Sequence, residues 1–352
     1  MKARNAITVL LVSAAALLFS PSCSRQDYVA ISGYAQGGSY LVKMNMSGVD
    51  VSPETVKHTM DSLLRVIDFS VSGYNAESLL SKFNSGESIR PDSVFMDIYR
   101  VSRSIWEDTD GAVDVAAAPM FDVWGFGFTA DSLPSPEMVA GLVSACGMDR
   151  LVPDIEPILD SEGMLNPADM VLDGKGALPR LNFNAVAQGY STDLLASYLR
   201  GIGVRDMLIN IGGEIYCEGL NPSRKPWVLG IDRPEDGNDV PGAKIEGTFN
   251  SGGRPCGIVT SGNYRKFYVR DGRKYAHTID PRTGWPVTHS LLSATVIAED
   301  ATMADALATC CMVLGLDAAS QMVEASEGVE ACLIYDDSGC MRAWTSSGFR
   351  LD

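Results

Sequence analysis

Two stretches in the last quarter of the chain carry residue types that can do chemistry. Tyr275-Ala-His-Thr-Ile-Asp-Pro-Arg-Thr-Gly-Trp-Pro286 places one of only three histidines beside an acid in a tight turn, and Ala304-Asp-Ala-Leu-Ala-Thr309 follows it. If the second stretch is helical, Asp305 and Thr309 are one turn apart and share a face. A carboxylate with a hydroxyl is an oxygen-ligand pair suited to Mg²⁺ or Ca²⁺ rather than zinc. The pattern predicts a site for a hard cation. The competing interpretations are an ordinary turn and a small-residue helix that only packs closely.

The elements that must position these residues alternate irregularly along the sequence. Two strands are expected around Gln36-Gly-Gly-Ser39, a helix opens at Ser52-Pro53, and a second helix over residues 91–106 is capped by Asp92. Further strands are expected at residues 181–187, 206–211, 227–231, 258–262, 266–270, 293–298, 331–335 and 341–345, with a helix from residue 189 and the helix that carries Asp305. This order lacks the regular βαβ alternation of a Rossmann fold and predicts an α+β fold.

The overall composition excludes some classes of binding partner. The chain has 352 residues, 46% of them hydrophobic and 20% charged, with a formal net charge of −16. Such a chain is globular, and its negative charge argues against nucleic acid and anionic membrane surfaces as partners. A phosphate ligand stays compatible with this charge if a cation or backbone amides neutralise it.

The first residues predict export. Lys2 and Arg4 precede an apolar run that ends before Cys23, so residues 1–22 are expected to be a signal peptide. A cysteine at this point favours a lipid anchor at Cys23 on the periplasmic side of a bacterial membrane, and ordinary cleavage nearby is the alternative. We expect residues 23–30 to form a tether and residues 31–352 to form one domain.

The seven other cysteines show no CxxC spacing, which disfavours a zinc site, and the sequence assigns no disulfide among them. Cys310 and Cys311 follow the predicted cation ligands and are expected to be buried packing residues.

Several motifs, taken in order, resemble the ApbE family of FAD:protein FMN transferases. They are Ser72-Gly-Tyr74 with Ser78 and Asn84, Gly111-Ala-Val-Asp114 with Trp124-Gly, Leu181-Asn-Phe-Asn-Ala-Val-Ala-Gln-Gly-Tyr-Ser-Thr-Asp193, Asn210-Ile-Gly-Gly213, Thr260-Ser-Gly262 with Tyr264, and the two stretches described first. Each motif is weak alone, but the ordered set covers roughly residues 31–316. The resemblance implies an ApbE-like fold related to the T-fold.

The resemblance also implies an activity. Members bind FAD and Mg²⁺, move FMN onto a serine or threonine hydroxyl of a partner protein, and release AMP. It makes Asp305, Thr309 and the backbone carbonyl of Ala185 the expected metal ligands. His277 is the candidate proton-handling residue, because imidazole titrates near neutral pH. An equally weighted alternative is that His277 only orients phosphate or Asp280.

By the same resemblance, a second group of residues is expected to contact FAD. Tyr74 would lie against the flavin ring, with a core tyrosine as the alternative interpretation. The other expected contacts are Gln36, Ala112, Val113, Asp114, Asn182, Gln188 and Ile279. Gln36-Gly-Gly38 replaces a Met-Gly-Thr of the family, Asn182 replaces an aspartate and Gln188 replaces a lysine. These exchanges put the details of FAD binding in doubt rather than the place of the site.

The expected partners are FAD and acceptor subunits of extracytoplasmic redox complexes. Two other functions fit the same residues: a hydrolase that cuts FAD to FMN and AMP, and a non-catalytic FAD-binding lipoprotein. A metal trio together with His277 favours catalysis.

Overall fold

The computed structural model describes residues 28–125, 133–174, 177–235, 238, 242–263, 267–270 and 273–350, without the side chains of residues 267–270 and 273–276. The predicted signal peptide and Cys23 lie outside this range. The first strand already begins at Tyr28, so residues 28–30, expected in the tether, belong to the folded sheet. The domain boundary at residue 30 is corrected to this extent.

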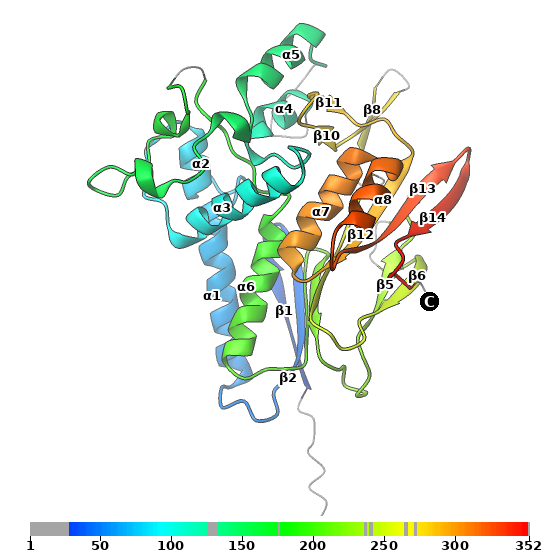
Figure 1. Cartoon of the computed structure of the whole chain (residues 1–352). Helices are drawn as coiled ribbons and strands as arrows, with labels where there is room; N and C mark the ends of the chain where they lie inside the picture. The colour runs from blue at the N-terminus through cyan, green and yellow to red at the C-terminus, as the bar shows by residue number, and fades with distance from the viewer. Residues whose placement is uncertain are drawn as a thin grey trace, which may run out of the picture.

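An antiparallel sheet of eight strands forms the centre of the fold (Figure 1). Its strands, in spatial order, are β1 (Tyr28–Ala35), β2 (Gly38–Asn45), β3 (Met207–Ile211), β4 (Glu214–Glu218), β7 (Cys256–Gly262), β12 (Leu291–Ala298), β13 (Glu330–Asp337) and β14 (Cys340–Thr345). Small two-stranded pairs are formed by β5 (Val228–Asp232) with β6 (Ile245–Asn250), β8 (Phe267–Arg270) with β9 (Arg273–Ala276), and β10 (Ile279–Asp280) with β11 (Trp285–Pro286). The predicted α+β class is confirmed.

The predicted first hairpin is present. Gln36 and Gly37 form its two-residue turn with φ angles of 51° and 76°, the positive values that a tight antiparallel hairpin requires. Burial alternates along β2, where Tyr40, Val42 and Met44 are buried. The hairpin therefore turns one apolar face toward the helices.

The α-helices lie mainly over one face and one end of the sheet (Figure 1). They are α1 (Pro53–Val71), α2 (Leu79–Asn84), α3 (Ser93–Asp108), α4 (Ala118–Val123), α5 (Pro136–Ala145), α6 (Ala187–Gly201), α7 (Ala301–Leu314) and α8 (Leu316–Ala325). The predicted N-caps of α1 and α3 are confirmed: the side chain of Ser52 accepts from Thr55 N, and that of Asp92 accepts from Phe95 N. Short 3-10 helices occur at Val115–Ala117, Met148–Arg150, Glu156–Ile158 and Pro167–Met170. In the described part of the chain, every helix is too short or too polar to span a bilayer.

The β5–β6 hairpin covers the other face of the sheet. Trp227, Ile231 and Phe249 pack with Cys217 and Cys256 in one buried cluster. The sheet therefore has apolar cores on both faces.

The strand predicted at residues 181–187 is wrong. This segment is a loop that runs into α6, which begins at Ala187. Leu181 and Phe183 are buried and mimic the alternation of a strand, but their backbone is held by side chains. Asn84 donates to Leu181 O and accepts from Leu181 N, both at 2.8 Å, and Asn182 accepts from Asn184 N. These local hydrogen bonds replace a strand ladder.

Candidate active site

Asp305 and Thr309 lie one turn apart on α7, as their spacing predicts. Asp305 is 5% exposed and Thr309 is half-buried. The start of α7 is fixed by two acids, because Asp300 caps it and Asp193 of α6 accepts from Ala301 N and Thr302 N at 2.9 and 2.8 Å. The helix that carries the predicted ligands is thereby anchored at its first turn.

The N-terminus of α6 meets the carboxylate of Asp305. Gly189 N donates to Asp305 Oδ2 at 3.1 Å, and no side chain caps α6. A Cβ on Gly189 would stand 2.4 Å from Ala301 O and 2.7 Å from Thr302 Cα, so only glycine allows the two helices to approach so closely. Ala185, the third predicted ligand, lies two residues before α6 on the same half-buried turn.

Burial and neighbouring acids make this carboxylate costly to ionise. Burial, followed by the nearby charge of Glu214, raises the pKa of Asp305 well above its usual value. Burial also raises the pKa of Asp193 to about 6, although hydrogen bonds from Thr302 and Ala301 oppose the shift. Among the residues that the structure describes, no lysine or arginine forms a salt bridge with Asp305. A buried acid beside a second acid is an environment that a cation stabilises.

The donor set fits a hard cation. In the predicted set Asp305 would supply a carboxylate, Thr309 a hydroxyl and Ala185 a backbone carbonyl, which are all oxygen ligands. No cluster of three or more His, Cys, Asp or Glu side chains suited to a metal exists in the described ranges. This is consistent with the predicted set, which contains only one carboxylate.

Two of the amides predicted to contact FAD lie beside the same helix terminus. Gln36 Nε2 donates to the hydroxyl of Ser191 in the second turn of α6. Gln188 lies against the β3–β4 turn, because a Cβ on Gly212 would be 2.3 Å from Gln188 Nε2 and 3.1 Å from Glu214 Oε2. The β1–β2 turn, the β3–β4 turn and α6 therefore converge near Asp305.

Asn182 and Asp114 lie together at a second edge of the region. Asn182 N donates to Val115 O at 2.8 Å. The carboxylate of Asp114 accepts from Ala116 N at 2.8 Å and from Met148 N at 3.0 Å. Burial raises the pKa of Asp114, an effect that these hydrogen bonds oppose. Both Asp114 oxygens organise the surrounding backbone.

Three of the predicted FAD contacts have buried side chains: Ala112, Val113 and Ile279 are 1%, 3% and 1% exposed. The turn around Ala112 lies beside the histidine turn, because a Cβ on Gly111 would be 3.9 Å from Arg282 Cγ. Arg282 forms a salt bridge with Asp280 at 2.9 Å.

His277 is half-buried and lies one residue before Thr278, whose hydroxyl donates to Asn263 Oδ1 at 2.7 Å. Burial raises the pKa of Cys310 to about 12, and the nearby charge of Arg282 opposes this effect. The histidine turn is therefore close to the part of α7 that contains Thr309. The other two histidines, His58 and His289, are exposed.

Tyr74 is 72% exposed just after α1, so the alternative of a core tyrosine is wrong. It borders an open hollow of ≈ 430 Å³ lined by Gly73, Tyr74, Ala76, Ser81, Lys82, Ser85 and Glu87. The hydroxyl of Ser78 donates to Ser72 O at 2.7 Å and also caps α2, whose last residue is Asn84. Since Asn84 holds Leu181, α2 connects the Tyr74 segment to the loop that leads into α6.

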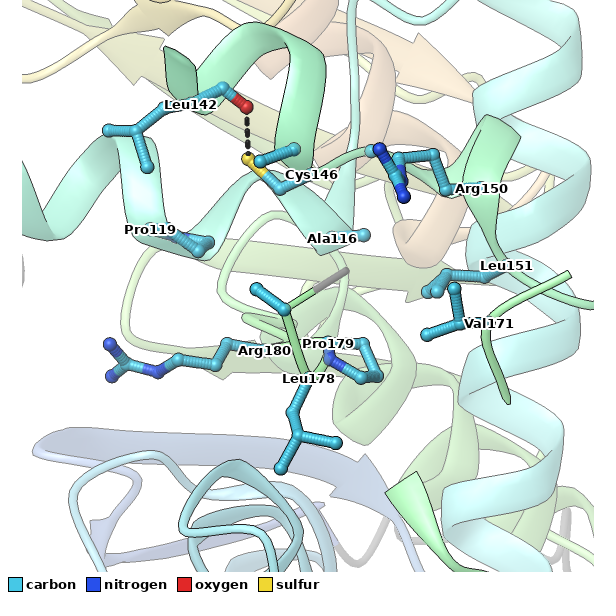
Figure 2. Close-up of a pocket in the computed structure, with 13 residues that line it drawn as sticks. Ala116, Pro119, Leu142, Cys146, Arg150, Leu151, Val171, Leu178, Pro179 and Arg180 are labelled. Carbon is cyan, nitrogen blue, oxygen red and sulfur yellow. Dashed lines mark hydrogen bonds between the residues drawn. The ribbon is translucent and has the colours of Figure 1, made fainter. Parts of the chain in front are cut away.

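A separate cavity lies among Ala116, Cys146, Leu151 and Leu178 (Figure 2). Its volume is ≈ 230 Å³, its walls are mostly apolar, and Arg150 and Arg180 stand at two of its sides. Pockets for drug-sized ligands span about 300–1,000 Å³. This cavity alone is therefore too small for a whole dinucleotide.

Neither Glu214 nor Asp193 is among the site residues predicted from the sequence. Glu214 directly follows Asn210-Ile-Gly-Gly213, and Asp193 ends the longest motif. An acid at the end of each motif was the available signal, but only the fold shows that both acids affect the charge of Asp305.

Comparison with known proteins gives a consistent result. The model of the ApbE family matches residues 37–333. A protein of Vibrio cholerae named FAD:protein FMN transferase is 30% identical over 348 residues, which cover 97% of this chain and 97% of that protein. The protein of the same name from Escherichia coli K12 is 30% identical over 316 residues, covering 88% of this chain and 85% of its own length.

Solved structures agree with the sequence matches. The apo form of the Pseudomonas stutzeri flavinyl transferase ApbE superposes with a TM-score of 0.77 at 28% identity, covering 92% of this chain and 95% of that chain. The flavin transferase ApbE of Vibrio cholerae gives a TM-score of 0.75 at 26% identity, covering 92% and 98%.

Proposed function

Because this chain belongs to the ApbE family, we propose that it transfers the FMN part of FAD onto a serine or threonine hydroxyl of an acceptor protein and releases AMP. The observation that carries the proposal is the contact between Asp305 and the first turn of α6. It joins a buried acid, which favours a cation, to a helix N-terminus, which favours phosphate.

The reaction is a phosphoryl transfer. The acceptor oxygen bonds to the FMN phosphorus, the bond from that phosphorus to the AMP oxygen breaks, and the hydroxyl proton must be removed. Positioning and charge neutralisation provide most of the catalysis in such reactions. The positive end of the α6 dipole would favour one phosphate, and Gly189, whose amide donates to Asp305, keeps this end close to α7.

We assign the metal ligands to Asp305, Thr309 and the carbonyl of Ala185, and the metal to Mg²⁺. The bound ion supplies neutralisation of phosphate charge. Glu214 and Asp193 stay outside the ligand set and make a cation at Asp305 more favourable through their charge.

His277 is the proposed base for the hydroxyl proton. It stands on the turn that approaches α7 near Thr309, and an imidazole is suited to this task near neutral pH. Tyr74, exposed beside an open hollow, is the proposed platform for the flavin ring.

The test is the intact mass of an acceptor domain after incubation with this protein, FAD and Mg²⁺, with EDTA in a parallel sample. A metal-dependent gain of one FMN less one water supports the transferase. AMP release without any mass gain supports hydrolysis of FAD instead. Absence of both products with an acceptor that a related transferase modifies refutes catalysis and leaves a flavin carrier.

Export and anchoring form a second part of the proposal. The basic start and apolar run before Cys23 support a signal peptide and a lipid anchor there. The acceptors would then be extracytoplasmic subunits of redox complexes. Labelling with a fatty-acid analogue tests this point: a Cys23→Ser variant should lose the label, and an equally labelled variant would refute the anchor.

A further inference from the structure

Two cysteines face each other where the β5–β6 hairpin leaves the sheet. Cys217 lies near the end of β4 and Cys256 begins β7, and the two are direct partners in the antiparallel register. Their Sγ atoms are 3.8 Å apart. The chain between them carries β5 and β6, which return to cover the same face of the sheet.

The backbone geometry suits a covalent bond. Directly opposed residues of antiparallel strands have Cα atoms about 4.5 or 5.5 Å apart. Disulfides form at Cα separations of about 4.4–6.8 Å. Rotation of the side chains can close the remaining distance between the sulfurs, and the strands need not move.

The surroundings also single out this pair. Cys217 and Cys256 are 0% and 1% exposed, and they lie under Trp227, Ile231 and Phe249. Three of the other five described cysteines have different contacts: Cys310 Sγ contacts Met322 Sδ, Cys146 Sγ donates to Leu142 O, and Cys332 is paired in register with Thr295 and Thr345.

We propose that Cys217 and Cys256 form a structural disulfide that ties the two ends of the segment carrying the β5–β6 hairpin. Both S–H bonds break and one S–S bond forms. The two electrons and two protons reduce a disulfide oxidant to two thiols. Because both sulfurs are buried once β5 and β6 have docked, oxidation takes place during folding, in a compartment that contains such an oxidant.

The experiment refolds the reduced protein in oxidised and reduced glutathione, then denatures it in an alkylating reagent without reductant. Peptide mapping should show one linked pair that contains Cys217 and Cys256, with the other five described cysteines alkylated. Alkylation of all seven, or a linkage between other cysteines, overturns the proposal.

Stability gives a second measurement. A crosslink that closes a loop of this length should raise Tm by roughly 5–10 °C relative to the reduced protein. Cys256→Ser should abolish the difference between the oxidised and reduced forms. Cys332→Ser is the matched control, since Cys332 is buried in the same cluster, and it should keep the difference. Equal Tm values for the oxidised and reduced unsubstituted protein count against the proposal. Peptide mapping of the unsubstituted protein tests the proposed disulfide even if a substituted variant fails to fold.

Discussion

Replacing Asp305 with asparagine tests two effects of its carboxylate separately: the destabilisation caused by a buried charge in the metal-free protein, and the binding of a metal ion. Asparagine has nearly the same size and keeps an oxygen that can accept from Gly189 N. In the absence of metal, burial and then the charge of Glu214 raise the pKa of Asp305. An acid whose pKa is raised in the folded state opposes folding at pH values above that pKa, by about 1.4 kcal/mol for each pKa unit.

The metal-free variant should therefore be at least as stable as the parent at pH 8, despite the change in its core. In the presence of Mg²⁺ the parent protein should be more stable than the variant. A ligand at 100 times its Kd stabilises a protein by about 2.7 kcal/mol, which for a chain of this size raises Tm by roughly 4–8 °C. The parent should show this shift, whereas Asp305→Asn should show almost none and should not transfer FMN.

Thermal unfolding in EDTA and in a Mg²⁺ series provides the assay. Asp317→Asn is the control, because it removes an exposed acid from the neighbouring helix α8 and should preserve the Mg²⁺ shift. A full Mg²⁺ shift in Asp305→Asn would show that Asp305 is not a metal ligand. A loss of more than about 2 kcal/mol in EDTA by Asp305→Asn, but not by Asp317→Asn, would show that the buried charge does not oppose folding.

Three other outcomes are expected. Gly189→Ala should destabilise the protein by about 2–4 kcal/mol and weaken Mg²⁺ binding, because its Cβ would meet the backbone of α7; Gly201→Ala, in open space on the same helix, should do neither in denaturant titrations. The pKa of about 6 at Asp193, raised above that of the unfolded chain, means that its ionisation opposes folding at high pH. Metal-free protein should thus gain about 1–2 kcal/mol between pH 8 and pH 5 from this group, and a pH series on Asp193→Asn with no smaller gain would contradict this assignment. His277→Ala should slow FMN transfer on the order of 10²- to 10⁴-fold with FAD affinity retained, while His58→Ala has no effect; a loss of less than a few-fold would make His277 an orienting residue.

Local patterns predicted those parts of the fold that local chemistry decides. Ser52-Pro53 and Asp92 start helices where expected, because capping and proline geometry depend on neighbours in sequence. The strand predicted at residues 181–187 was wrong because its backbone is held by Asn84, almost a hundred residues away. An alternating apolar pattern cannot reveal such a partner.

The same distinction between local patterns and long-range contacts applies to the candidate active site. The spacing of Asp305 and Thr309 was sufficient to place them on one face of a helix. The effect of Glu214 on Asp305 depends on the start of β4 lying beside α7, a long-range contact that the motif before Glu214 cannot reveal. The ring and phosphate contacts of the remaining predicted residues stay predictions.

The order of the sheet strands also determines when the site can form. Tyr40 of β2 pairs with Ile211 of β3, so the whole chain from β2 through α6 lies between two neighbouring strands. Closing a loop of this length costs more conformational entropy than closing a hairpin, and such distant pairings slow folding. The β1–β2 hairpin, although synthesised first, must wait for β3 before it can join the sheet. We therefore expect Gln36 to reach α6 only after β2 has paired with β3, and Asp305 to join only after α7, near the end of the chain, has been synthesised. Cation binding at Asp305 should thus report the completed fold and not an early intermediate.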